Sequence, residues 1–197
     1  MNLKTLLTAT ALCTFGAMAS AQDMGELSVG VGVTNFGYSL EGEYSISPTL
    51  SVRGMIMGGF SINDEIEVED ETVDGEANLG GLALLADYYP FANPWRVSGG
   101  LFFSNSDVTG TFDSGSGTYE GEIAFENEVA PLITTGFSAE IAQGWSISGD
   151  IGVIVSSLEA SSDDATPAVQ ADIDDINADL SDIPVFPFIG FAVSYTY

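Results

Sequence analysis

The chain has 197 residues, of which 29 are acidic and three are basic, with no histidine and one cysteine, so its formal net charge is −26. A nucleic-acid-binding protein needs a basic surface to neutralise phosphates, and three cationic residues cannot supply one. The lack of histidine excludes catalysts and metal sites that depend on an imidazole. Because 45% of the residues are apolar, the composition also excludes a disordered acidic chain.

Residues 1–21 have the pattern of a secretory signal peptide. Lys4 supplies a positive charge, residues 6–17 form a short apolar stretch, and Ala19-Ser20-Ala21 is a small-x-small cleavage site. A membrane-spanning anchor, the alternative, needs about 20 apolar residues and does not fit this length. We therefore predict a signal peptide over 1–21 and a mature domain over 22–197. Cys13 lies in the signal segment, so the mature domain is expected to contain no disulfide.

The dominant pattern of the mature chain is an alternation of apolar residues with small or polar residues, which is typical of β-strands with two different faces. Eight segments have this pattern: 27–34, 38–46, 50–60, 81–88, 95–104, 133–141, 145–155 and 189–197. In a soluble sandwich, the apolar faces would form the core. In a membrane barrel, they would face lipid, and the other faces would line a narrow interior.

Three features favour the barrel. The second face of the strands is rich in Gly, Ser and Thr, which suits a crowded lumen. Short connections at 47–49, 90–94 and 142–144 alternate with long ones, as in outer-membrane barrels. Aromatic residues gather at the short-turn end, as in an interfacial girdle: Tyr44, Tyr88, Tyr89, Phe91, Trp95, Trp145, Tyr195 and Tyr197. We predict an all-β fold, an eight-stranded antiparallel up-and-down transmembrane β-barrel. Ten strands also fit the chain length.

Most acidic residues fall in the three long connections, which we predict to be solvated loops on one side of the membrane. An alternative is a divalent-cation site at Asp70, Asp74 and Glu76, because this stretch resembles the opening of an EF-hand loop. Gly81 occupies the twelfth position, where that motif needs a glutamate. In the last loop, apolar residues spaced four, three and four apart predict one short helix over 167–180. We expect it to pack on the barrel rim; a partner-binding helix is the alternative.

Arg53 and Arg96 are the two cationic residues outside the signal segment, and both fall on lumen-facing positions. Five acidic residues share that interior, which gives a predicted lumen charge network of Arg53, Arg96, Glu41, Glu43, Asp87, Glu140 and Asp150. Asp87 and Arg96 flank the second short turn and are expected to lie close together. Because an unpaired buried charge is costly, we predict paired charges that plug the lumen. A catalytic cluster is the alternative.

Three internal segments, GLALLADYYPF at 81–91, RVSGGL at 96–101 and GWSISGDIGV at 144–153, resemble small outer-membrane β-barrel proteins of Gram-negative bacteria, of the OmpA/OmpX/OmpW-like kind. The ending PFIGFAVSYTY at 187–197 resembles the terminal signal read by the barrel assembly machinery. The resemblance implies that Phe191, Val193, Tyr195 and Tyr197 form this assembly signal. It also implies an integral outer-membrane location, with membrane lipid and lipopolysaccharide as partners. No peptidoglycan-binding domain follows the barrel, so a wall-tethering role is not expected.

These observations predict a non-catalytic outer-membrane barrel with long acidic surface loops and a structural or surface role in the envelope. The alternative is a narrow channel for small solutes or cations. Lipid hydrolases of membrane barrels use histidine as a general base, which this chain lacks, so we expect no catalytic residues and no cofactor. Divalent cations are candidate partners, and nucleic acid is not.

Overall fold

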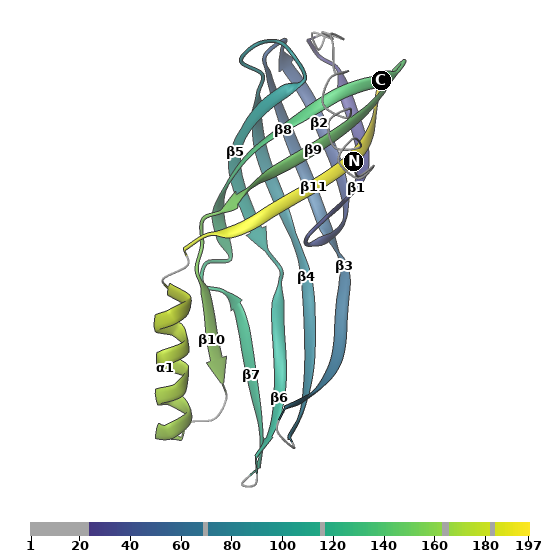
Figure 1. The fold of residues 1–197 in the computed structure, drawn as a ribbon. Helices are drawn as coiled ribbons and strands as arrows, with labels where there is room; N and C mark the ends of the chain where they lie inside the picture. The colour runs from purple at the N-terminus through teal and green to yellow at the C-terminus, as the bar shows by residue number, and fades with distance from the viewer. Residues whose placement is uncertain (1–23, 69–70, 115–116, 163–165, 182–183) are drawn as a thin grey trace, which may run out of the picture.

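The computed structural model describes residues 24–68, 71–114, 117–162, 166–181 and 184–197 (Figure 1). The predicted signal peptide lies outside them. The elements are β1 (Leu27–Thr34), β2 (Gly37–Ser47), β3 (Leu50–Val68), β4 (Glu71–Tyr88), β5 (Trp95–Ser104), β6 (Asp107–Ser114), β7 (Gly117–Phe125), β8 (Val129–Ala142), β9 (Trp145–Ile154), β10 (Leu158–Ser162), α1 (Pro167–Ser181) and β11 (Phe186–Thr196). Among the described residues, no helix is long and apolar enough to cross a membrane.

Eight strands close into an antiparallel barrel in the order β1-β2-β3-β4-β5-β8-β9-β11. The first and last strands pair with each other, with Val31 opposite Val193, so the barrel has no open edge. Closure satisfies the backbone groups between neighbouring strands. The predicted eight-stranded fold is confirmed, and each predicted segment contributes one barrel strand.

The long connections differ from the prediction, because two of them are largely strand. β3 and β4 continue past the barrel as one hairpin, and their ladder extends to the pair Val68–Glu71. β6 and β7 pair alongside β4, and β10 pairs with β7. Figure 1 shows these strands projecting from one end of the barrel. We call this projecting sheet, together with α1, the extension.

The predicted helix is confirmed as α1, but it does not pack on the barrel rim. It lies along β10, at the edge of the extension (Figure 1). The Asn177 amide holds it there, since Asn177 Nδ2 donates to the carbonyl of Ala160 at 3.0 Å and Asn177 Oδ1 accepts from the Ala160 amide at 2.7 Å. A side-chain amide thus satisfies two backbone groups at a strand edge. Unpaired groups there could form hydrogen bonds with a strand of another molecule.

A bulge in β3 marks the change from barrel to extension. The register with β4 shifts between Met57 and Phe60, and Gly59 within it has a φ of 90°. An L-residue with a side chain rarely adopts this left-handed conformation, so glycine is the residue that fits. Bulges bend a strand and increase its twist, which lets one continuous strand serve both the barrel wall and the extension.

The outward face of the barrel is apolar and exposed, as the alternation predicts. Ile151 is 60% exposed and Phe191 is 59% exposed, and Leu40 and Val97 also point away from the protein. Within the described part of the chain, no second protein layer covers these side chains, in contrast to a β-sandwich. Seven of the predicted girdle aromatics are exposed near the short turns and the C-terminus: Tyr44, Tyr88, Phe91, Trp95, Trp145, Tyr195 and Tyr197. Tyr89 is the exception, because its side chain is buried.

The half of the lumen next to the extension is filled by aromatic and aliphatic side chains. Phe36, from the β1–β2 turn, packs on Phe102 with ring centroids 4.9 Å apart. Phe125 and Phe188 also lie near Phe36, with centroids 6.3 Å from its ring. We call these four residues the phenylalanine layer. The alternation predicted an interior of Gly, Ser and Thr, so this half of the lumen corrects that expectation.

Replacing Phe102 by Ala is expected to lower the free energy of unfolding by about 3–5 kcal/mol, because it removes a fully buried ring and leaves a cavity. Urea unfolding in detergent measures this change. Phe91→Ala is the matched control, since Phe91 is 71% exposed. Equal effects of the two substitutions would contradict the existence of a packed phenylalanine layer.

Candidate functional site: a buried charge cluster

A cluster of charged side chains fills the lumen on the side of the short turns. Its members lie on inward positions of five strands: Glu41 and Glu43 on β2, Arg53 on β3, Asp87 on β4, Arg96 on β5 and Asp150 on β9. We call these six residues the lumen charge cluster. Inward positions follow from the two-residue period of a strand, because successive side chains point to opposite faces. All six are buried, and Asp87 is 0% exposed.

The two arginines and the two aspartates form the centre of the cluster. Arg53 Nη1 lies 2.8 Å from Asp150 Oδ2, and Arg53 Nε lies 2.9 Å from Asp87 Oδ2. Arg96 Nη2 lies 2.7 Å from Asp150 Oδ2, and Arg96 Nη1 lies 3.9 Å from Asp87 Oδ2. Each guanidinium thus faces both aspartates, and these four residues carry no net charge. Hydrogen bonds between ionised groups are stronger than those between neutral groups, and the contacts of 2.7, 2.8 and 2.9 Å are of this kind.

The two glutamates lie farther from the arginines. Glu41 Oε2 is 3.6 Å from Arg53 Nη1, and Glu43 Oε2 is 3.7 Å from Arg96 Nη1. Tyr89 connects the second pair, because its hydroxyl donates to Glu43 Oε1 at 3.1 Å and accepts from Arg96 Nη1 at 3.3 Å. With both glutamates ionised, four carboxylates would face two guanidinium groups, a surplus of two negative charges.

Glycines on neighbouring strands make the space for these carboxylates. A Cβ on Gly136 would lie 2.5 Å from Asp150 Oδ1, and a Cβ on Gly30 would lie 2.9 Å from Glu41 Oε1. Such distances are shorter than van der Waals contact, so any larger residue would displace the acid. The glycine-rich inward face therefore gives room to charged groups from the strand alongside.

The structure brings together six of the seven residues that the sequence placed in the lumen network, including Asp87 and Arg96. Glu140 lies elsewhere: it is exposed, and its Oε1 accepts a hydrogen bond from the Gly144 amide at 3.2 Å beside a short turn. Tyr89, which the sequence placed in the girdle, instead contacts the cluster through Glu43 and Arg96. The signal that would have found it is the alternation itself, because Tyr89 follows Asp87 by two positions.

The described part of the candidate cation loop, from residue 71 onward, is β-strand. Asp74 and Glu76 lie in β4, opposite Glu65 and Asn63 of β3, whereas an EF-hand loop needs a sharp turn. Asp70 lies outside the described residues. Glu76 Oε1 accepts a hydrogen bond from Asn78 Nδ2 at 3.4 Å. In the described parts of the chain, no three His, Cys, Asp or Glu side chains are grouped so that they could hold a metal ion.

The residues of the predicted assembly signal lie on one face of the last strand. Phe191, Val193 and Tyr195 of β11 are exposed on the outward face, and Tyr197 follows at the chain end. Trp145 contacts Tyr195 and Tyr195 contacts Tyr197, with ring centroids 5.2 and 5.1 Å apart. The terminal aromatics therefore join the girdle at the short-turn end.

The lumen is closed in the region of the cluster. A gap lined by Thr34, Ser39, Glu41, Met55 and Asp150, among others, has no space for a water molecule. Beyond it, the phenylalanine layer fills the other half of the barrel. Arg53 and Arg96 are 2% and 1% exposed, so a substrate in solution would not reach them without a rearrangement.

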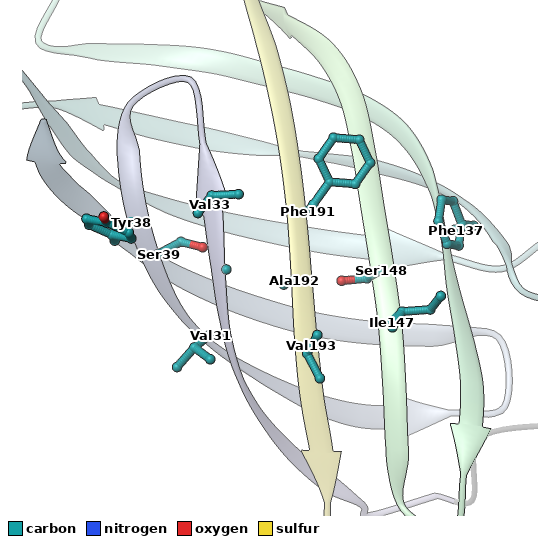
Figure 2. A pocket seen from close by; sticks show the side chains of 11 residues that line it. Val31, Val33, Tyr38, Ser39, Phe137, Ile147, Ser148, Phe191, Ala192 and Val193 are labelled. Carbon is teal, nitrogen blue, oxygen red and sulfur yellow. The ribbon is translucent and has the colours of Figure 1, made fainter.

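A separate apolar groove of about 680 Å³ lies across β2, β1, β11, β9 and β8. Figure 2 shows Val31, Val33, Phe191 and Val193 along two of these strands, with Phe137 at the edge of the groove. Its exposed apolar side chains belong to the outward face. The groove is thus a hollow in the apolar face, and Ser39, Ser148, Phe191 and Ala192 line both the groove and the gap beside Glu41 and Asp150.

No family model and no curated protein matches the chain. Among solved structures, CarO2 of Acinetobacter baumannii aligns at a TM-score of 0.64 and 16% identity, over 89% of this chain and 100% of that one. CarO of the same organism aligns at 0.61 and 18% identity, over 89% and 98%. A major outer membrane protein from Thermus thermophilus gives 0.46 and 15% identity, over 89% and 100%. The chain thus shares the fold of outer-membrane β-barrel proteins.

Replacing Asp150 by Asn is expected to cost about 3–5 kcal/mol of unfolding free energy, because it removes a charge that pairs with both buried arginines. Equilibrium unfolding of the folded barrel in detergent measures the loss. Glu140→Gln is the control for removing an acid, and a surface change of this kind shifts stability by no more than about 0.5 kcal/mol. A similarly small effect of Asp150→Asn would show that the ion pairs do not support the fold.

Proposed function

We propose that this protein is a non-catalytic, integral outer-membrane β-barrel that supports the envelope and presents an acidic extension at the cell surface. The observation that carries the proposal is the combination of an exposed apolar outer face with a filled, charged lumen. In water, so large an exposed apolar surface would promote aggregation. In a bilayer, the same surface contacts hydrocarbon, which offers no hydrogen-bond partners. The backbone groups of a closed barrel pair between strands and therefore need none.

The two ends of the barrel differ in a way that supports one orientation. The short turns lie at one end, and the extension lies at the other (Figure 1). The girdle aromatics lie in or beside those short turns and the C-terminus. Outer-membrane barrels have short turns on the periplasmic side and longer segments outside. We infer that the extension projects from the cell.

The extension carries exposed acidic side chains on several of its elements: Glu76, Glu122, Glu126, Glu159, Asp174, Asp175 and Asp179. Like charges on a projecting surface repel one another and keep neighbouring molecules apart. This supports a surface role in which the extension resists association.

The proposed partners follow from the same surfaces. Membrane lipid and lipopolysaccharide would contact the apolar outer face, and an acyl chain fits the groove of Figure 2 in size and polarity. The terminal residues Phe191 to Tyr197 would contact the barrel assembly machinery during insertion. The cluster lacks histidine and is buried, which supports a structural role for its charges in place of a catalytic one.

A narrow channel, the alternative function, would need a path through the lumen. The lumen charge cluster blocks one half and the phenylalanine layer blocks the other, so both would have to move. Nothing in the described residues favours that rearrangement, and we therefore propose a closed barrel.

Planar-bilayer recordings of the purified, folded protein are expected to show no steady conductance, because the lumen is filled at two levels. A general porin reconstituted in the same way is the positive control. A reproducible open state that persists at constant voltage would contradict the closed barrel and support the channel.

Replacing Ile151 by Lys is expected to destabilise the protein in lipid vesicles by about 2–4 kcal/mol, because Ile151 lies in the middle of a spanning strand on the outward face. Ile176→Lys, on the exposed part of α1, is the matched control and is expected to change stability little. Reversible denaturant unfolding in vesicles measures both. Equal values would argue against lipid contact at Ile151.

A further inference from the structure

A polar pocket of about 530 Å³ lies where the barrel meets the extension. It is lined by residues 57–61 of β3, by 78–80 of β4, and by Asn105 and Asp107 beside the turn into β6. β4 changes its partner at this point, because residues 81–88 pair with β5, whereas 73–78 pair with β6. The volume lies in the range of about 300–1,000 Å³ that small-molecule sites have. We call this hollow the junction pocket.

The junction pocket lies at the level of a membrane interface. Phe60 lines it and packs edge-on against Tyr38, with ring centroids 5.5 Å apart. Tyr38 is 65% exposed and Phe60 is 37% exposed. Tyr38 lies at the start of β2, whereas Tyr44 of the girdle lies toward the other end of the same strand. Because outer-membrane barrels carry aromatic residues at both interfaces, this pair marks the interface on the side of the extension.

The polar groups of the junction pocket meet around one amide. Ser61 Oγ donates to Asn78 Oδ1 at 2.6 Å, and Asn78 Nδ2 donates to Asp107 Oδ2 and to Glu76 Oε1, each at 3.4 Å. Hydrogen bonds of 3.4 Å are longer than the usual range, so a hydroxyl of a ligand can replace either of them. The exposed Asn105 side chain adds a second amide, which offers both donors and an acceptor.

These groups define the class of ligand that suits the pocket. The carboxylates of Asp107 and Glu76 repel a phosphate or any other anion. An ammonium group only donates hydrogen bonds, so it would leave the amide donors of Asn78 and Asn105 unused. A sugar hydroxyl both donates and accepts, as a set of amides and carboxylates requires. The apolar ring of Phe60 covers the side of the pocket next to Tyr38, where the C–H face of a sugar ring can pack.

We propose that the junction pocket binds a neutral sugar residue, and that the core oligosaccharide of lipopolysaccharide supplies it. Asp107 and Asn105 contact the hydroxyl groups, and Phe60 contacts one face of the ring. The choice of lipopolysaccharide rests on the proposed function, because only an extension outside the cell brings the pocket to the outer leaflet. The preference for a neutral sugar rests on the lining residues alone.

Saturation-transfer NMR tests the proposal on the folded protein in lauryldimethylamine oxide, a detergent without a sugar headgroup. The probe is the core oligosaccharide released from lipopolysaccharide by mild acid and then dephosphorylated. We expect saturation to pass from the protein to the ring protons of the sugar. Ethanolamine, an ammonium probe, is expected not to compete. Lack of transfer to the sugar overturns the proposal, and competition by ethanolamine overturns the assignment of a neutral sugar.

A filled pocket provides the decisive variant. A Cβ on Gly58 would meet only backbone atoms of Leu79 and Gly80, at 3.8 and 3.9 Å, so Gly58→Leu fits the fold and occupies the pocket. It is expected to abolish the transfer. Gly54→Leu, on the same strand beside the exposed Leu84, is the matched control and is expected to leave the transfer unchanged, since its nearest neighbour would be Leu84 Cδ2 at 3.7 Å. Transfer that survives in Gly58→Leu overturns the proposal.

A second variant tests the polar contacts. Asn105→Ala is expected to raise the Kd of the oligosaccharide about fivefold, the effect of one lost hydrogen bond, and an unchanged Kd would contradict the contact. The shift in gel mobility on heating shows that each variant is folded. The probe reaches the pocket from solution whichever way the barrel faces. A conductance that contradicts the proposed function would therefore leave this result intact, and the two failures can be told apart.

Discussion

The structure depends on a single closed sheet whose outer and inner faces meet different surroundings. Each barrel strand has one face toward the outside and one toward a lumen too narrow for bulk water, and the pairing of β1 with β11 removes the last edge. Apolar side chains then occupy the outside, where Ile151 and Phe191 are exposed. Charged residues of the barrel wall have only the interior or the rim left to them. The cluster of two arginines and four acids is the direct consequence.

The lumen is stabilised by two different kinds of contact. Near the short turns, Arg53 and Arg96 each face Asp87 and Asp150, so that four buried charges compensate one another. Near the extension, the phenylalanine layer fills the lumen by apolar packing. Ion pairs demand defined geometry, and aromatic packing excludes water. Together they fill the cylinder from which the long sheet projects.

The eight barrel strands and the helix were predictable because their signals are local. Alternation in segments such as 145–155 indicates a strand with two different faces. The spacing of Val169, Ile173 and Ile176 indicates one face of a helix. The position of Arg53 and Arg96 on the inward face followed from the same period. Six of the seven expected lumen residues therefore meet in space.

The extension was not predictable from the density of acidic residues, which is typical of solvated loops. The stretch Glu65-Ile66-Glu67-Val68 does alternate, but its charge suggested a loop. Strand pairing of 61–68 with 71–78 arises because the hairpin continues a ladder that the barrel has already begun. Glu140 was misplaced for a related reason, since the period of a strand does not show where the rim ends. The packing of Phe36 on Phe102 joins a turn to a strand far away in the sequence. A local sequence pattern cannot predict such a contact.

The most direct test of the account places a nitroxide spin label on the outward face. The one cysteine of the chain, Cys13, lies in the predicted signal segment, so single cysteines at Leu40, Val97, Ile151 and Phe191 can be labelled selectively after reconstitution in vesicles. Power-saturation spectroscopy then compares the access of oxygen, which dissolves in hydrocarbon, with that of a water-soluble nickel chelate. If the apolar face meets lipid, all four positions show strong relaxation by oxygen and weak relaxation by nickel. Protection from both reagents would place these side chains inside protein, and stronger relaxation by nickel would place them in water; either result would contradict a barrel whose apolar face meets lipid.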